Sequence, residues 1–280
     1  TGLIVTSRNL PVLAVRGRPA PRRYRGRLHD PAGHMFKRLS DWFETTERRM
    51  RRSFGDDIST PEMRRQAWWH FNLFDHAFLR VPWTNFDKVA EDVYRSNHPG
   101  PRRLKRYKEM GIRGILNLRG DDGYSPWLFE QEACEELGLE LRVAKIYARK
   151  AARRHEIVQL INTMREMPKP FVMHCKSGAD RAGFAAVLYK AIIEGVPLEE
   201  ARKHLAVKYI HFDWTETGIV DHILDMYELR NAAAPIDMER WFRTEYNQRL
   251  ASDTFRAKQD GKDWKKKFPL PAPDAGSVAD

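Results

Sequence analysis

One short segment of the chain carries residue types suited to phosphate chemistry. It reads His-Cys-Lys-Ser-Gly-Ala-Asp-Arg-Ala-Gly over residues 174–183. A short apolar run at 171–173 precedes it and a largely apolar, helically spaced stretch at 184–193 follows it, so we expect a loop between a buried strand and a buried helix. In such a loop, successive backbone N–H groups and the helix N-terminus favour a bound anion.

Cys175 and Arg181 are the candidate catalytic residues of this loop. Arg181 follows Cys175 by six positions, and its guanidinium can bind two phosphate oxygens in a bidentate fork. The same positive field favours the thiolate form of Cys175, which is the nucleophilic form. We expect in-line attack on phosphorus and a phosphocysteine that water hydrolyses. A buried structural cysteine followed by unrelated residues is the less favoured alternative.

The other residues of the loop are expected to shape the phosphate site. Lys176, Ser177, Gly178 and Ala179 are the candidate substrate-binding residues, because their backbone amides line the turn. Gly178 allows the chain to turn. The hydroxyl of Ser177 could donate a hydrogen bond to the thiolate or to the departing sulfur.

This segment resembles the catalytic loop of the protein tyrosine and dual-specificity phosphatase superfamily, which reads His-Cys-(five residues)-Arg. The resemblance covers roughly residues 86–230, and the stretches Val-Tyr-Arg-Ser-Asn-His-Pro (93–99) and Gly-Ile-Arg-Gly-Ile-Leu-Asn-Leu-Arg (111–119) resemble the opening of compact bacterial and fungal members. It implies an α/β fold with a central mixed or parallel sheet flanked by helices, and hydrolysis of phosphomonoesters. It also implies that His174 orders the loop and does not transfer protons.

Two positions depart from the superfamily pattern. Ala182 stands where a Ser or Thr usually helps the sulfur leave, so either Ser177 substitutes or that step is slow. The stretch 145–154, where the usual general acid would lie, contains no carboxylate. Asp180 is the nearest candidate for the acid, and myotubularin lipid phosphatases have an Asp at the same position. Alternatively, Asp180 is a structural carboxylate paired with an arginine.

Other residues are weaker candidates for the acid. Asp121 and Asp122 follow the strand expected at 114–118, and a solvated turn explains them more simply. Helix capping explains Glu156 and the neighbouring His155.

Basic residues are expected around the mouth of the site, namely Lys176, Arg149, Arg153 and Arg154. They favour a substrate with more negative charge than one phosphotyrosine, such as an anionic phospholipid or an inositol phosphate. Several phosphoinositide phosphatases also carry Lys next to the catalytic cysteine. Ordinary solvated charge explains these residues equally well, so phosphoprotein, phospholipid and inositol phosphate all remain possible substrates.

Composition and periodicity divide the chain into four parts. They are a disordered extension (1–34), a helical N-terminal segment (35–85), a catalytic domain of alternating strands and helices (86–230), and a C-terminal helix and tail (231–280). Between Met238 and Leu250 apolar residues recur every four positions, which predicts a single amphipathic helix. The aromatic residues at 68–83 either lie on anionic lipid or pack on the catalytic domain, and we favour packing.

Bulk composition limits the class of protein. The net charge is +11, but residues 1–34 hold seven Arg and one Asp and so account for +6 of it. The remainder suits acidic partners such as phosphate esters, and no specific nucleic acid is expected. Only Cys134, predicted to be a packed thiol, accompanies Cys175, so no disulfide framework is possible. Without a secretory signal or a membrane-spanning apolar run, we expect a cytoplasmic protein, with possible peripheral contact with an anionic membrane.

We expect no metal site, because no His, Cys and carboxylate residues have metal-ligand spacing, and no cofactor. Other functions remain to be weighed against a cysteine-dependent phosphatase. An RNA 5′-triphosphatase uses a similar cysteine loop, although the chain has no evident nucleic-acid-binding appendage. A catalytically weak phosphate-binding module would explain Ala182 and the missing acid. A rhodanese-type sulfurtransferase also has a cysteine loop, but it would not need Arg181.

Overall fold

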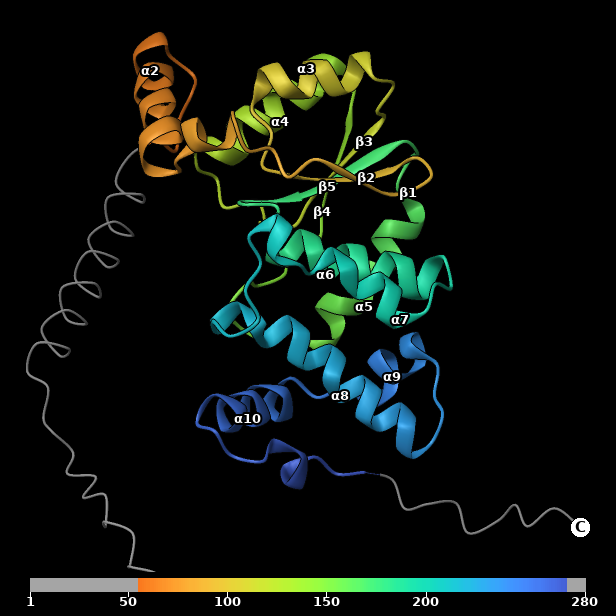
Figure 1. Ribbon diagram of the computed structural model, residues 1–280. Coiled ribbons are helices and arrows are strands. Elements are labelled where there is room, and N and C mark those ends of the chain that lie inside the picture. Colours follow the sequence, from red (N-terminus) through yellow and green to blue (C-terminus); the bar gives the residue numbers. More distant parts are fainter. Residues whose placement is uncertain (1–54, 271–280) are drawn as a thin grey trace, which may run out of the picture. The chain divides into compact units, whose positions relative to one another are not determined.

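A five-stranded mixed sheet lies at the centre of the computed structural model, which describes residues 55–270, all within the unit Thr46–Asp280 (Figure 1). The strands are β1 (Asp87–Ala90), β2 (Val93–Asn97), β3 (Gly114–Asn117), β4 (Glu140–Val143) and β5 (Phe171–Cys175). Their order is β1-β2-β5-β3-β4. Only β1 runs antiparallel to its neighbour; the other pairs are parallel. The predicted α/β fold is confirmed.

The central strand β5 positions the loop of residues 175–181, which is the predicted catalytic loop. All five of its residues are buried, as predicted for the run at 171–173. In the sheet, Asn97 of β2 pairs with Cys175 and Asn117 of β3 pairs with His174. Because parallel strands end at the same edge of a sheet, the residues that follow β2 and β3 lie beside the catalytic loop.

Helices cover both faces of the sheet (Figure 1). From the first strand onward, the α-helices are α3 (Pro101–Glu109), α4 (Ser125–Leu137), α5 (Arg154–Glu166), α6 (Asp180–Leu188), α7 (Leu198–Ala201), α8 (Ile219–Ala233), α9 (Met238–Thr244) and α10 (Gln248–Gln259). Helices α9 and α10 lie beyond α8, away from the sheet (Figure 1). The side chain of Val172 packs with residues of α3 and α4, whereas Phe171, Met173 and Cys175 pack with α5, α6 and α8. This alternation follows from the two-residue period of a strand.

Helix α6 follows the catalytic loop and is buried nearly all round. Every residue from Ala182 to Leu188 is buried, which confirms the prediction of a central apolar helix. The helix continues into a π-helical turn at Tyr189–Ile193. Because a buried helix cannot shift without disturbing the core, its N-terminus is a fixed anchor for the loop.

The N-terminal segment is helical where it is described, while residues 1–54 lie outside the described part. It comprises α2 (Pro61–Trp69), a π-helical turn (His70–Phe74) and a 3₁₀ turn (Ala77–Arg80). The Thr60 hydroxyl caps α2 by accepting from the Met63 N–H at 3.2 Å. Phe71 is buried against Phe129, with ring centroids 5.8 Å apart. Four other aromatic residues, Trp68, Trp69, Phe78 and Trp83, are about half exposed, so the packing interpretation holds for only part of this segment.

The C-terminal region forms two helices where the sequence predicted one. Between α9 and α10 the chain breaks, and the side chain of Asn247 caps α10 by accepting from two backbone N–H groups. Tyr246 lies in the break and is still buried in the main core. A four-residue apolar spacing therefore continues across a turn, which is why the break was not predicted. Residues 271–280 of the predicted tail lie outside the described part.

The helices of the described region do not meet the requirements for crossing a bilayer. None of those within residues 55–270 combines sufficient length with sufficient hydrophobicity.

Candidate active site

The catalytic loop, residues 175–181, connects β5 to α6 and turns tightly around the sulfur of Cys175. The Gly178 N–H donates to Cys175 Sγ at 3.2 Å. Gly178 has φ +75°, and a Cβ atom at this position would lie 2.7 Å from the backbone of Ser96 and Asn97. Both the positive φ and the close approach require glycine. The turn thus holds a backbone amide on the sulfur.

Arg181 lies beside the thiol, as predicted. Its side chain is partly buried. Desolvation lowers the pKa of Arg181, while the charge of Cys175 and a hydrogen bond to its sulfur oppose this shift. The guanidinium and the sulfur therefore face the same small space. An anion that enters this space would meet a fixed cation and the loop amides together.

Arg95 holds the outer side of the loop. It donates to the carbonyl oxygens of Gly178 and Ala179, the latter at 3.1 Å, and its guanidinium lies 3.8 Å from the ring centroid of Tyr209. Burial lowers the pKa of Arg95 to about 10. Because the loop carbonyls point toward Arg95, the amides on the other side of the same peptide planes are left for the sulfur and an anion.

Two further side chains complete the loop's support. The Asn85 amide donates to the Ser177 carbonyl at 2.8 Å. The Ser177 hydroxyl accepts from the Ala179 N–H at 3.3 Å, so in this structure it serves the turn. Ala182 is fully buried and supplies no hydroxyl to the departing sulfur.

His174 supports the loop from behind. Its Nε2 lies 2.6 Å from Glu130 Oε1, and the Asn117 amide donates to Glu130 Oε2 at 2.6 Å. The His98 ring lies edge-on to the His174 ring, with centroids 4.9 Å apart. His174 is completely buried, and its role as an ordering residue stays a prediction.

The fold also brings together three potential metal ligands that are far apart in the sequence. Suitable atoms of His98, Glu130 and His174 lie within 4.8 Å of one another, and all three residues are buried. Sequence spacing did not reveal this cluster. The Asn117 amide donates to one oxygen of Glu130. The other oxygen faces His174 Nε2 at ion-pair distance, and neither of these two buried atoms makes a hydrogen bond.

Asp75 connects the N-terminal segment to the site. It is buried and forms ion pairs with Arg80 at 2.8 Å, Arg119 at 2.7 Å and Lys176 at 3.6 Å. Burial opposes its ionisation, but these three cations hold the pKa of Asp75 well below its usual range. Arg119 follows β3, and its charge helps to lower the pKa of Arg181. One carboxylate thus holds two basic residues at the edge of the catalytic loop.

Asp180 pairs with a different residue from the arginine that the structural alternative named. Its Oδ1 lies 2.7 Å from His211 Nδ1, and His211 Nε2 lies 2.7 Å from Asp221 Oδ2. The partner of Asp180 is therefore a histidine, not an arginine. Burial opposes a charge on this ring, but hydrogen bonds to the two carboxylates outweigh it and raise the pKa of His211 to about 9. At neutral pH the ring is a cation that donates to both.

The raised pKa of His211 predicts a pH-dependent stability. Because the folded pKa of about 9 exceeds the model value of 6.5, the stabilisation is complete below pH 6.5 and is lost as the pH rises through 9. One pKa unit corresponds to about 1.4 kcal/mol, so the effect is at most about 3 kcal/mol. In urea unfolding, His211→Gln should lower the free energy of unfolding most at pH 6 and only slightly above pH 9. The same destabilisation at both values would contradict this.

The remaining predicted residues are spread around the site. Asp121 and Asp122 are exposed, and Asp122 accepts from the Tyr124 N–H at 3.5 Å in a turn. Glu156 accepts from the Arg153 N–H at 2.7 Å as a helix cap. His155 is exposed. Asp121 and Asp122 therefore lie in a solvated turn, and Glu156 caps a helix.

The basic residues expected at the mouth have other partners. Arg149 lies 3.8 Å from Glu216, and Arg154 donates to the Tyr246 carbonyl at 2.9 and 2.8 Å. Lys176 pairs with Asp75, whereas Arg153 is exposed. Cys134 is buried among apolar residues, and burial raises the pKa of its thiol, in agreement with a packed thiol.

Five residues of the site were not assigned from the sequence: Asp75, Arg95, Arg119, His211 and Asp221. Arg95 and Arg119 fall within stretches that resemble phosphatases, and an arginine inside or just after a buried strand is a usable signal. The others carry no local signal, because their partners are distant in the sequence.

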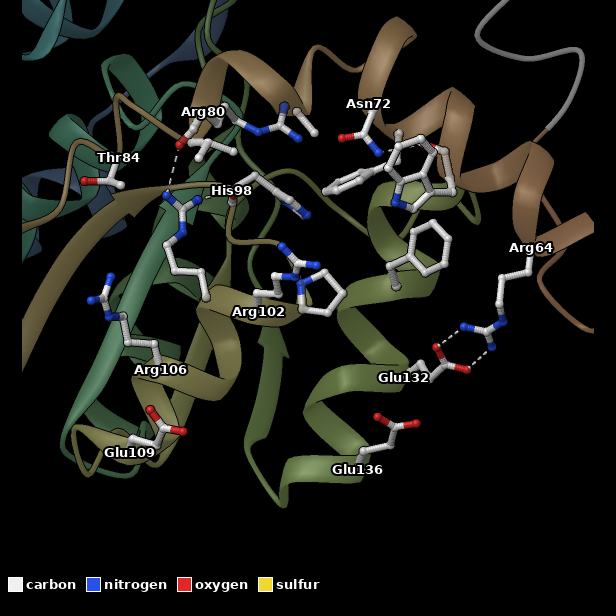
Figure 2. A pocket seen from close by; sticks show the side chains of 18 residues that line it. Arg64, Asn72, Arg80, Thr84, His98, Arg102, Arg106, Glu109, Glu132 and Glu136 are labelled. Carbon is white, nitrogen blue, oxygen red and sulfur yellow. Dashed lines mark hydrogen bonds and ion pairs between the residues drawn. The ribbon is translucent and has the colours of Figure 1, made fainter. Parts of the chain in front are cut away.

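A groove of about 960 Å³ lies beside the site and is distinct from the catalytic loop (Figure 2). It is lined by residues of the N-terminal segment, of 98–109 and of α4, and by none of residues 174–183. Arg64 forms an ion pair with Glu132 across it (Figure 2). Trp68, Phe71 and Phe129 contribute apolar surface.

Part of the chain is similar to known proteins. Residues 89–203 match the family model described as the tyrosine phosphatase family. No curated protein matches the chain significantly. Among solved structures, TpbA of P. aeruginosa is similar over 49% of this chain and 83% of its own, with 17% identity and a TM-score of 0.41. The active form of Tk-PTP is similar over 53% and 99%, with 21% identity and a TM-score of 0.39. The core catalytic domain of the PP-IP phosphatase SIW14 from S. cerevisiae is similar over 54% and 91%, with 17% identity and a TM-score of 0.39.

Proposed function

We propose that this chain, of which residues 89–203 match the model of the tyrosine phosphatase family, is a phosphatase that hydrolyses phosphomonoesters through a phosphocysteine intermediate. The observation that carries this proposal is the meeting of Cys175 and Arg181 at the N-terminus of a buried helix, with the Gly178 amide on the sulfur. A thiolate and a phosphate-binding fork then occupy one site.

The reaction follows from these positions. The Cys175 thiolate attacks phosphorus, so an S–P bond forms while the bond to the leaving oxygen breaks. Arg181 and the loop amides bind the equatorial oxygens, where negative charge remains throughout. Water then attacks the phosphocysteine, which releases inorganic phosphate and restores the thiolate. Fixed donors need no reorganisation during either step, which is the source of the rate enhancement.

We propose Asp180 as the group that exchanges the proton. It is the carboxylate adjacent to Arg181 in the loop, and the stretch 145–154, where the usual acid would lie, contains no carboxylate. In the first step the leaving oxygen takes the proton from Asp180, and in the second step the attacking water returns one to it. His211 holds one oxygen of Asp180 and so fixes the position of the carboxyl group beside Arg181.

Asp180→Asn should slow substrates with poor leaving groups far more than activated ones. An alkyl phosphate needs a proton at its leaving oxygen, whereas a nitrophenolate leaves without one. General acid catalysis contributes about 10²–10⁴-fold, so we expect a loss in kcat in that range for alkyl phosphates and less than about tenfold for p-nitrophenyl phosphate. Asn keeps an acceptor oxygen for His211. Equal losses on both substrates would exclude Asp180 as the acid.

The function itself is tested by phosphate release from p-nitrophenyl phosphate by the whole chain, with a chelator present. Turnover that survives the chelator and follows burst kinetics supports a metal-independent phosphocysteine route. Absence of turnover, together with intact binding of inorganic phosphate, would instead favour the phosphate-binding module. A panel of phosphotyrosine peptides, phosphatidic acid, phosphoinositides, soluble inositol phosphates and 5′-triphosphorylated RNA then identifies the substrate class.

A further inference from the structure

Exposed apolar side chains gather next to the catalytic loop. Two of them, Val81 and Trp83, end the N-terminal segment, and three more, Val207, Ile210 and Trp214, lie between α7 and α8. We call these five residues the apolar rim. Their exposed fractions are 77%, 46%, 62%, 48% and 71%. Large apolar residues that are exposed in one region of a soluble domain mark an interaction surface.

Asn85 joins the two halves of the rim to the phosphate site. This residue comes two positions after Trp83, and its amide donates to the carbonyl of Ser177 in the catalytic loop at 2.8 Å. The same amide donates to the carbonyl of Tyr209 at 2.9 Å, directly before Ile210. Segments about 120 residues apart in sequence therefore meet at the loop.

Each half is also held by a second contact. The Trp83 carbonyl accepts from the side chain of Asn97, which pairs with Cys175 across the sheet. His211, adjacent to Ile210, binds Asp180. Further along this stretch, the Trp214 ring lies 4.9 Å from the Phe212 ring. The rim is thus fixed in place relative to the nucleophile, as a surface that presents substrate must be.

The groove beside the site extends the rim. Val81 belongs to both, and Thr84, next to Trp83, also lines the groove (Figure 2). From there the groove continues along Trp68, Phe71 and Phe129. Figure 2 shows Arg102 and Arg106 along helix α3, one turn apart on the groove side. Glu109, Glu132 and Glu136 line the same groove, so its border carries charge of both signs. Its apolar walls match the apolar part of an amphipathic ligand, and the arginines match an anionic head.

The charge around the catalytic loop points to the same ligand chemistry. A soluble inositol polyphosphate would need several uncommitted cations around the mouth. Of the four basic residues expected there, Lys176 pairs with Asp75, Arg149 lies near Glu216 and Arg154 binds a backbone carbonyl, which leaves the exposed Arg153. The strong anion site is confined to the loop, where Arg181 and Arg119 lie. One phosphate group bound there would leave its apolar part against the rim.

We propose that the apolar rim docks on the surface of an anionic bilayer, and that the substrate is a phospholipid with a terminal phosphomonoester. This deepens the proposed function and depends on it for the substrate, though not for the docking. Aromatic and aliphatic side chains enter the headgroup region while arginines meet anionic lipid heads. The rim would then hold the catalytic loop at the depth of the lipid phosphates, so the substrate needs no extraction into water.

The test compares a rim variant with a matched control in the full chain. Trp83→Ser/Trp214→Ser removes two exposed indoles that touch no catalytic group. Met110→Ser is the control, because Met110 is also half exposed but lies before β3 begins, at the opposite edge of the sheet. Co-sedimentation uses phosphatidylcholine vesicles with and without phosphatidic acid. Turnover is measured on those vesicles and on p-nitrophenyl phosphate.

We expect the wild type and Met110→Ser to bind the phosphatidic acid vesicles and release phosphate from them. The rim variant should bind and turn over about tenfold less, since its loss of interfacial contact is of the order of 1.4 kcal/mol. Its turnover of p-nitrophenyl phosphate should stay within about twofold of the wild type. This contrast separates docking from catalysis.

Several results would overturn the proposal. One is a wild type that does not co-sediment with the vesicles, and another is a rim variant that co-sediments as well as the wild type does. A third is a dimer in solution that is lost when the rim indoles are replaced. A rim variant impaired only on phosphotyrosine peptides would assign the rim to protein substrates instead. Vesicle binding without turnover of any phosphate ester would leave the docking supported and refute the proposed function.

Discussion

Cys175→Ser is expected to abolish turnover of every phosphate ester. A serine hydroxyl is not ionised at neutral pH and the loop cannot make it a comparable nucleophile, so kcat should fall by at least about 10⁴-fold. The fold should persist, because Cys and Ser have similar volumes. Phosphate release from p-nitrophenyl phosphate measures the loss.

Two controls sharpen this experiment. Inorganic phosphate should still raise the melting temperature of Cys175→Ser, because Arg181 and the loop amides remain and a ligand stabilises the state that binds it. Cys134→Ser changes the other cysteine, which packs in the core away from the loop, and should retain activity. Turnover by Cys175→Ser above about 1% of wild type would remove the phosphocysteine from the mechanism.

Arg181→Ala should have the second largest effect. It removes the cation beside the sulfur together with the bidentate grip on the phosphate, and loss of comparable transition-state donors costs about 10²–10³-fold in kcat. KM should rise as well, because the fork also binds the ground state. Steady-state kinetics on p-nitrophenyl phosphate give both values.

Arg181→Lys distinguishes geometry from charge. Lysine keeps the positive charge but replaces a planar fork with a single point. We expect it to recover phosphate-dependent thermal stabilisation in part and kcat only weakly. Full recovery of kcat by lysine would show that charge alone is needed at this position, and the bidentate model would be wrong.

Asp180 and His211 change how the absent acid of residues 145–154 is understood. The carboxylate does not pair with an arginine, as one reading of the sequence held, but with a histidine cation shared with Asp221. That pairing is compatible with the acid role we propose and also fixes the loop to α8. The dependence of Asp180→Asn activity on the leaving group tests the chemical role of Asp180. The pH dependence of His211→Gln stability tests the structural role of the pair.

The N-terminal segment takes part in the site as well as in the surface. Asp75 of this segment holds Arg119 and Lys176 at the catalytic loop, whereas Val81 and Trp83 are exposed. The sequence offered two interpretations of these aromatic residues, packing or lipid contact. The structure divides the segment between an inner face that packs and an outer face that is open to a partner.

Local features of the sequence were enough to determine the core of the fold and the reactive loop. A buried strand, Cys175, Arg181 and a buried helix are contiguous, and strand and helix periodicity extend over only a few residues. Such patterns can be read directly from the chain. They predicted β5, α6 and the catalytic pair, and they predicted the α/β class.

Only the tertiary structure decided which distant groups surround that loop. Asp75, Arg95, His211 and Asp221 act through partners dozens of residues away, and a single sequence contains no record of such pairing. The helix break at Tyr246 and Asn247 was not predicted for a related reason, since buried residues can keep a helical spacing across a turn. The conversion of a phosphate loop into a site with a defined proton partner and an apolar rim therefore depends on chain packing, which brings together side chains that local periodicity cannot connect.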